Sequence, residues 1–200
     1  ISKLDVSNNY QLIKIEATFD NNLTNIVFGS GTYNYLTNLD LRFNVLESLD
    51  VTRCPKLSYL DLLSNKLTSI DLTKNPRLAQ LGLGSNLLTS LDVTHNTRLI
   101  SMGIGLNQIP QIDLSNNPQL DILTANGNPI TDIDLSHNIY LTQLLLESTK
   151  IEAIDVSKLS MLQYFYINFT PIKNIDVSKN TNLLALQASN CPNLETVNLK

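Results

Sequence analysis

The sequence repeats with a period of 21 residues, and this period constrains the fold more strongly than any other feature of the chain. An Asp that follows an aliphatic residue recurs at this interval at Asp50, Asp71, Asp92, Asp113, Asp134, Asp155 and Asp176. Leucines recur at the same interval at Leu36, Leu57, Leu78, Leu99, Leu120, Leu141, Leu162 and Leu183. A fixed period of this length indicates a solenoid, in which each repeat forms one coil and stacks on its neighbours.

Each repeat contains the same short phrase twice. The unit over residues 67–87 reads LTSIDLTKNPRLAQLGLGSNL, with L-x-x-I-D-L-x-x-N in its first half and L-x-x-L-x-L-x-x-N in its second. The second phrase is the leucine-rich-repeat signature. Because residues alternate between two faces of a strand, its aliphatic positions are predicted to point inward and the residues between them outward.

These features predict one leucine-rich-repeat domain over residues 1–200, with about nine units and irregular spacing at 12–45 and at the C-terminal end. A half-unit of ten or eleven residues leaves little room for a helix, which rises only ~1.5 Å per residue. We therefore expect a mostly β solenoid with parallel strands and few or no helices. Opposite the strands we expect either a second sheet or a shorter extended, turn-like side. The chain begins and stops inside the pattern without an obvious polar cap, so we expect either a longer natural protein or open ends that pair with a partner.

Asparagines recur at two positions of the unit, where the backbone leaves the predicted strand and its amide groups lose their sheet partners. An unpaired buried polar group costs about 1–3 kcal/mol, so stacked asparagines can form a stabilising ladder. The two cysteines stand where the asparagines usually stand, and we predict small ladder residues there instead of redox or metal groups. The ladder residues are Asn65, Asn86, Asn107 and Asn128 with Cys191, and Asn75, Asn96, Asn117, Asn138 and Asn180 with Cys54.

The phrases LTSLDVTHNTRLISMGIGLNQ and IKNIDVSKNTNLLALQASNCP resemble the 21-residue leucine-rich repeats of bacterial surface proteins, in particular the internalin J-like group. This resemblance covers nearly the whole chain and implies export to the bacterial surface and a role in adhesion or recognition. In that group the second half often carries Cys as its last inward residue. This chain differs, because it has Leu62, Leu83, Ile104, Ala125, Leu146, Ile167 and Ala188 at those positions.

The outward positions of the first half-unit hardly vary. The Asp column recurs in seven consecutive units, and a Ser or Thr follows two residues later in each. One interpretation is local, with Asp and Ser or Thr holding turn amides beside a column of basic residues. The alternative is a row of cation sites, for example for Ca²⁺, which prefers oxygen ligands. One carboxylate per coil favours the local interpretation.

The outward positions of the second half-unit vary from coil to coil, and there we expect ligand contacts. Gly82, Gly84, Gly103 and Gly105 remove four outward side chains from two adjacent coils, which predicts a shallow depression. Exposed aromatic residues further along are typical of interfaces and also stack on sugars. The predicted ligand-binding residues are Tyr59, Leu63, Gly82, Gly103, Leu145, Tyr164, Tyr166 and Phe169. Drift in a tolerant array, or contacts with a neighbouring domain, would also produce this variation.

Other classes of function find little support in the residues. The net charge of −4 and a pI near 5.1 argue against nucleic-acid binding, and no apolar run approaches the ~18 residues of a membrane span. The chain has no G-x-S-x-G motif and no phosphate-binding loop, so we predict no catalytic, metal or cofactor site. The prediction is a non-enzymatic recognition module of the bacterial cell surface, or a secreted one, that binds a protein or glycan. The alternative is a structural spacer that displays other domains.

Overall fold

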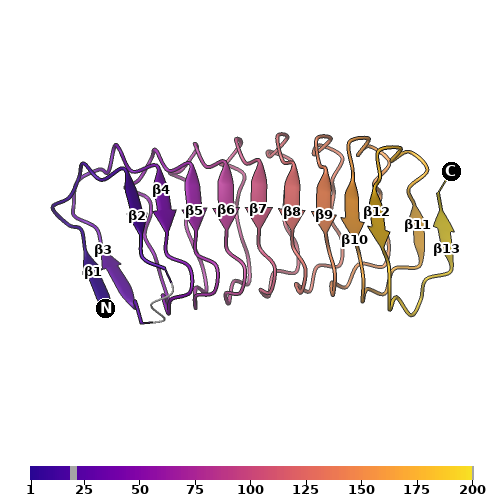
Figure 1. The fold of residues 1–200 in the computed structure, drawn as a ribbon, viewed down its shortest axis with the longest axis horizontal. Helices are drawn as coiled ribbons and strands as arrows, with labels where there is room; N and C mark the ends of the chain where they lie inside the picture. The colour runs from indigo at the N-terminus through magenta and orange to yellow at the C-terminus, as the bar shows by residue number, and fades with distance from the viewer. Residues whose placement is uncertain (19–21, 200) are drawn as a thin grey trace.

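The computed structural model describes residues 1–18 and 22–199, which wind into a solenoid with the two termini at opposite ends (Figure 1). Nine short strands form one parallel sheet in the order β12-β10-β9-β8-β7-β6-β5-β4-β2. Their bounds are β2 Lys14–Glu16, β4 Asn38–Asp40, β5 Tyr59–Asp61, β6 Gln80–Gly82, β7 Ser101–Gly103, β8 Ile122–Thr124, β9 Gln143–Leu145, β10 Tyr164–Tyr166 and β12 Ala185–Gln187. The predicted parallel solenoid of about nine coils is confirmed.

The opposite side of the solenoid is mostly extended and turned. In the described part of the chain, this side forms strand pairs only at its ends, β1 (Lys3–Asp5) with β3 (Asn25–Val27) and β11 (Asn174–Asp176) with β13 (Thr196–Asn198). Of the two architectures left open by the sequence, one full sheet facing an extended side is therefore the one adopted. Residues 1–18 and 22–199 contain no helix. It follows that none of these residues belongs to a helix long and apolar enough to cross a membrane.

The repeat keeps neighbouring strands in register. Each strand has three residues, and its middle residue points into the core while the flanking residues face outward, as in β5 with Leu60 fully buried. Tyr59 pairs with Gln80, and Gln80 pairs with Ser101, so equivalent positions line up across the coils. Outward residues therefore form continuous columns. We call the outward face of the nine-stranded sheet the strand side, and the opposite extended side, which carries the Asp column, the Asp side.

A ladder of buried asparagines runs behind the ends of the strands, and we call it the strand-side ladder. Asn86 shows its chemistry: Nδ2 donates to the carbonyls of Leu62 in the preceding coil at 2.9 Å and Leu83 in its own coil at 3.0 Å. Its Oδ1 accepts the backbone N–H of Leu67 at 3.0 Å. Each amide thus satisfies donors and acceptors of two coils. The same bonding recurs at Asn44, Asn65, Asn107 and Asn128.

The Asp-side ladder is bonded differently. Nδ2 of Asn96 donates to the carbonyls of Leu72 at 3.1 Å and Asn75 at 2.9 Å. Its Oδ1 is buried and accepts no hydrogen bond within the described part of the chain, and the same holds at Asn75, Asn117, Asn138 and Asn180. This ladder therefore satisfies carbonyl groups only. It is also interrupted by two fully buried side chains without an amide, Cys54 and Leu159.

The strand-side ladder is also interrupted, by residues that lie toward the C-terminus. The hydroxyls of Thr149 and Thr170 each donate to a carbonyl of their own coil at 2.8 Å. Cys191, predicted as a buried ladder residue, is only partly buried, with its Sγ 3.2 Å from the carbonyl oxygen of Ile167. It follows β12, the edge strand of the nine-stranded sheet.

The irregular stretch near the N-terminus accommodates a tyrosine in the Asp-side ladder. Tyr33 stands 21 residues before Cys54 and is fully buried. Its hydroxyl donates to the Val6 carbonyl at 2.7 Å and accepts the N–H of Gly29 at 2.9 Å. A longer loop holds this larger side chain. Glycine is required in that loop, because a Cβ on Gly31 would lie 2.6 Å from the ring of Tyr10.

Candidate functional site

The Asp side uses its polar groups locally. Oδ1 of Asp71 accepts the backbone N–H of Thr73 at 2.9 Å and its hydroxyl at 2.7 Å. The backbone bond recurs in every coil from Asp50 to Asp176. Among residues 1–18 and 22–199, no group of three or more His, Cys, Asp or Glu side chains could hold a metal ion. The Asp side therefore presents the same surface at each coil, with every carboxylate of the Asp column hydrogen-bonded within its own coil.

These bonds make an acid-dependent contribution to stability. The hydroxyl and backbone N–H of the following Ser or Thr lower the pKa of Asp71, Asp92 and Asp113 below the ordinary value. A carboxyl whose pKa is lower when folded stabilises the fold above its unfolded pKa of about 3.9, and this stability is lost as pH falls. We expect the melting temperature to fall below about pH 4, and to fall less in an Asp71→Asn/Asp92→Asn/Asp113→Asn variant. Thermal melting from pH 7 to pH 2.5 tests this, and equal losses in both proteins would contradict it.

The strand side is hollowed over β5 to β8. The hollow has a volume of about 300 Å³. Its lining comes from four coils and comprises Asp61, Leu63, Gly82, Gly84, Ser85, Gly103, Gly105, Leu106, Thr124 and Asn126. A second shallow space shares Asp61, Gly82 and Gly103 with it and extends to Tyr59. The structure thus brings four of the predicted ligand-binding residues together, namely Tyr59, Leu63, Gly82 and Gly103.

The glycines do not contribute equally to this hollow. A Cβ on Gly103 would meet no atom within 4 Å, so this residue forms the open floor. A Cβ on Gly82 would overlap the Asp61 carboxylate, and one on Gly84 would lie 3.0 Å from Leu63 Cδ1. Asn126 leans over Gly105 in the same way. The expected four-glycine depression is therefore smaller, because side chains of neighbouring coils fill three of the vacated positions and become its walls.

This difference predicts opposite effects for two alanine substitutions. Gly103→Ala adds a methyl group in open space and restricts the unfolded chain, so it should stabilise the protein by about 0.5–1 kcal/mol. Gly82→Ala must displace the Asp61 carboxylate, which accepts the N–H of Leu63 at 3.0 Å, and should destabilise by about 1 kcal/mol. Urea unfolding of both variants checks the signs, and two effects of equal sign would disprove this description of the walls.

A partly buried ion pair lies next to the hollow on the N-terminal side. Arg42 binds Asp40 with two hydrogen bonds, Nε to Oδ1 at 2.9 Å and Nη2 to Oδ2 at 2.7 Å. Asp61 lies further from the same guanidinium, with Oδ2 at 3.6 Å from Nε, and accepts a bond from the Tyr59 hydroxyl at 3.3 Å. Burial raises the pKa of Asp61 and of Tyr59 above their ordinary values. The guanidinium is therefore committed mainly to Asp40.

The other predicted residues form a separate aromatic group over β9 and β10. Tyr164 and Tyr166 are half-buried, and their rings meet edge to face with centroids 6.4 Å apart. Leu145 is half-buried on the neighbouring strand, and Phe169 is 58% exposed at the following turn. Beside them the amide of Asn168 donates to Glu147 Oε1 at 2.6 Å and Gln187 Oε1 at 3.0 Å, which forms a polar row across three coils.

Leu106 is a site residue that the sequence analysis missed. It lines the hollow, is 59% exposed, and has a left-handed backbone with φ of 56°. The left-handed position recurs in the coils of β4 to β10 and β12, at Phe43, Ser64, Ser85, Leu106, Gly127, Ser148, Phe169 and Asn190. A left-handed conformation costs a non-glycine residue about 1–2 kcal/mol, and this turn recurs as part of the repeat. The available signal was a large apolar residue, as at Phe43 and Phe169, in a column otherwise filled by Ser, Gly and Asn.

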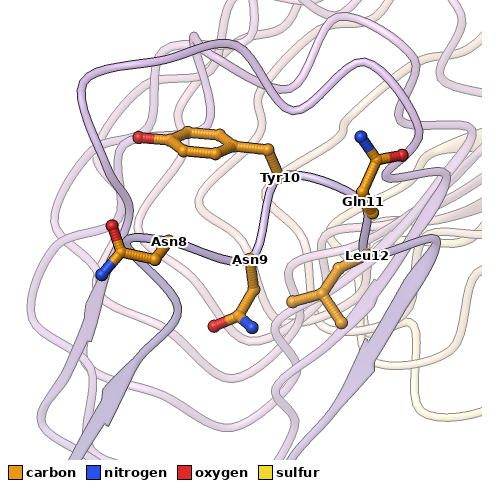
Figure 2. Close-up of a pocket in the computed structure, with 5 residues that line it drawn as sticks. All are labelled: Asn8, Asn9, Tyr10, Gln11 and Leu12. Carbon is orange, nitrogen blue, oxygen red and sulfur yellow. The ribbon is translucent and has the colours of Figure 1, made fainter.

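A separate concavity of about 300 Å³, away from the strand-side hollow, lies in the first coil. Its lining is one continuous turn, Asn8, Asn9, Tyr10, Gln11 and Leu12 (Figure 2). Tyr10 packs against Tyr33 with ring centroids 5.1 Å apart, so its ring is occupied in supporting the N-terminal coils. Because the described residues that line this space come from a single turn, we favour the hollow over β5 to β8 as the candidate site.

No protein-family model matches the chain, and no curated protein matches it. Among solved structures, it is similar to the functional domain of InlJ from Listeria monocytogenes, with 33% identity and a TM-score of 0.87. That match covers 97% of this chain and 47% of the InlJ chain, so this chain spans about half the length of that structure. Internalin C2 of Listeria monocytogenes is 25% identical with a TM-score of 0.72, covering 78% of this chain and 73% of that one.

A leucine-rich-repeat protein of Leptospira interrogans shares the fold, with 19% identity, a TM-score of 0.66, and coverage of 90% of this chain and 61% of that one. The InlJ structure is described as including a cysteine ladder. This chain has two cysteines, Cys54 and Cys191, and they lie in different ladders. The last inward positions of its second half-units, from Leu62 to Ala188, are aliphatic instead.

Proposed function

We propose that this chain, which is an internalin J-like leucine-rich-repeat array with 21-residue units, is a non-enzymatic recognition module that binds a protein partner through its strand side. The observation that supports this most strongly is the contrast between its two sides. On the Asp side each carboxylate is bound by its own coil. On the strand side the outward columns vary along the array, and four coils enclose the hollow around Gly103.

The exposed apolar residues on the strand side support the same proposal. Leu106 and Phe169 are more than half exposed and hold a strained left-handed backbone. The left-handed backbone belongs to the repeat, but the exposure of these two apolar side chains does not stabilise the isolated domain, and exposed apolar residues are common where a binding surface is formed. Leu106 borders the hollow, and Phe169 lies in the aromatic group. Both regions would then take part in recognition.

We place the protein on the bacterial cell surface or among secreted proteins, with a role in adhesion. The similarity to Listeria internalins supports this location. Because the InlJ chain is about twice as long as the matched region, we also propose that further domains accompany this array in the full-length protein.

A glycan ligand is a second candidate, favoured by the aromatic group alone. Tyr164 and Tyr166 lie beside the row of Glu147, Asn168 and Gln187. Aromatic faces together with amide and carboxylate groups are suited to bind sugar rings and their hydroxyls. A structural spacer without a ligand would gain nothing from a varied strand side, and the hollow counts against it.

A binding screen tests these proposals. Extracellular-matrix proteins, mucins and a glycan array are presented to the wild-type chain, to Gly103→Leu, which fills the hollow, and to Tyr164→Ala/Tyr166→Ala. Circular dichroism first establishes equal folding. Saturable binding of a protein that Gly103→Leu loses supports the protein-recognition module, while binding of a glycan lost only by the tyrosine variant favours the second candidate. No binding up to ~100 μM, a free energy near −5.5 kcal/mol, supports the spacer.

A further inference from the structure

Basic residues are excluded from the strand side over most of its length. The second half-units at 57–65, 78–86, 99–107, 120–128, 141–149, 162–170 and 183–191 contain no Lys or Arg. They contain three acids, Asp61, Asp121 and Glu147. The lysines and arginines of these coils lie in the first half-units and at the turns, for example at Lys74 and Arg98. From β5 to β12 the strand side therefore favours cationic ligands.

Asp61 is the acid that borders the hollow, and its charge is incompletely neutralised. Two carboxylates, Asp40 and Asp61, share the single guanidinium of Arg42, and both of its hydrogen bonds go to Asp40. The Asp61 side chain is 19% exposed and leans over Gly82 toward the floor at Gly103. A partly desolvated carboxylate without a dedicated counter-charge attracts a cation more strongly than a fully hydrated one.

The other walls suit an aliphatic stem. Leu63 and Leu106 provide apolar walls, and Gly103 leaves the backbone floor open. Lysine and arginine side chains combine a run of methylene groups, which packs on apolar surface, with a charged end that seeks a carboxylate. A neutral apolar side chain would match Leu63 and Leu106 and would supply no further positive charge to Asp61, whose nearest guanidinium nitrogen lies at 3.6 Å.

We infer that the hollow receives a lysine or arginine side chain of the protein partner, with its stem over Gly103 between Leu63 and Leu106 and its cationic end at Asp61. This inference rests on the proposed protein-recognition function and specifies what part of the partner enters the site. It also assigns Asp61 as the residue that determines specificity.

Peptide selection tests the inference without a known partner. A random dodecapeptide phage library is selected on the wild-type chain after depletion on Gly103→Leu, and enriched peptides are synthesised. We expect the enriched peptides to share one Lys or Arg. Replacing a shared Lys by norleucine, or a shared Arg by citrulline, should weaken binding to the wild type about fivefold and leave binding to Asp61→Asn nearly unchanged. Asp134→Asn, which removes the same charge on the Asp side, should behave as the wild type.

The outcomes separate this inference from the function on which it rests. Two results would overturn the cationic assignment and leave the protein-recognition module standing. One is that peptides which depend on the hollow share no basic residue. The other is that norleucine or citrulline weakens peptide binding equally on the wild type and on Asp61→Asn. If no enriched peptide depends on the hollow, both the inference and the hollow as a protein site are wrong. The inference is supported if the peptides share a basic residue, and if replacing this residue weakens binding to the wild type and to Asp134→Asn but not to Asp61→Asn.

Discussion

Replacing Asn86 by Leu is expected to destabilise the solenoid by about 2–3 kcal/mol, whereas the same replacement at Asn96 should cost less than about 1 kcal/mol. Both asparagines are buried in the middle of the array, and the change in side-chain volume is identical. The pair therefore compares two hydrogen-bonding environments at constant size. Differences in overpacking are the main effect that the comparison must exclude.

The predicted contrast follows from what each substitution leaves behind. Without the Asn86 amide, the buried N–H of Leu67 loses the acceptor that it has at 3.0 Å. The three carbonyls bound by Asn86 each keep another donor, since Asn65 binds Leu62, Asn107 binds Leu83, and the N–H of Ser64 binds Gly84. The unpaired N–H of Leu67, together with the lost hydrogen bonds of the Asn86 amide, accounts for the expected loss of stability.

At Asn96 no donor is left unpaired. Its Nδ2 bonds go to the carbonyls of Leu72 and Asn75, which also accept the N–H groups of Asn75 and Leu78. Its Oδ1 accepts no bond in the described structure, so Leu removes an unsatisfied oxygen. Leu159 already occupies the equivalent position of a later coil and is fully buried.

Thermal and urea unfolding of the two variants measures the contrast. For a chain of this length, the melting temperature of Asn86→Leu should fall by roughly 5–10 °C, and that of Asn96→Leu by a few degrees at most. Asn86→Ala and Asn96→Ala, which cannot overpack, serve as the control pair. Equal destabilisation of the two ladders in both pairs would show that the unpaired Leu67 N–H does not dominate.

The sequence predicts the solenoid because the period of 21 residues sets the length of one coil, and the L-x-L phrase sets which residues of the strand point inward and which point outward. It cannot distinguish the two asparagine ladders, since Asn86 and Asn96 look alike within their half-units. Their difference depends on whether a backbone N–H of the preceding coil points at the amide, as that of Leu67 does. This is a property of the stacked coils, and no residue spacing reveals it.

The candidate site was predictable in position and less so in shape. Variation of the outward columns located the strand side, and glycines marked the coils of the hollow. The direction in which Asp61 and Asn126 lean over Gly82 and Gly105 depends on side-chain packing across coils. The backbone strain at Leu106 depends on a left-handed turn that most coils fill with small residues. Both features require the three-dimensional arrangement.

Tyr33 was missed for a different reason. The residue lies one period before Cys54, yet the longer loop before it hides the alignment of its coil. From the sequence alone, residues 28–35 therefore look like a local insertion. In the structure the loop is needed because Tyr33 is longer than Asn and still binds the carbonyl of the preceding coil, that of Val6. The insertion and the unusual ladder residue have one cause.

We expect Tyr33→Leu to destabilise the N-terminal coils by about 3 kcal/mol, and Tyr33→Phe by about 1–2 kcal/mol. Phe keeps the ring contacts with Tyr10 and Phe28, at centroid distances of 5.1 and 4.9 Å, and loses only the hydroxyl. That hydroxyl donates to Val6 and accepts from Gly29, so two backbone groups lose a partner. Leu loses the aromatic contacts as well.

Because each coil of a solenoid contacts only its neighbours, the damage should remain local. Hydrogen exchange should accelerate in the first coils, at Val6, Ile26 and Leu36, while amides of β8 to β10 keep their protection. Tyr35→Leu is the matched control, since Tyr35 is 54% exposed and two residues away. If Tyr33→Phe exchanged like the wild type, the hydroxyl would have no part in the ladder. If protection fell evenly along the array, the coils would unfold as one unit and the local account would fail.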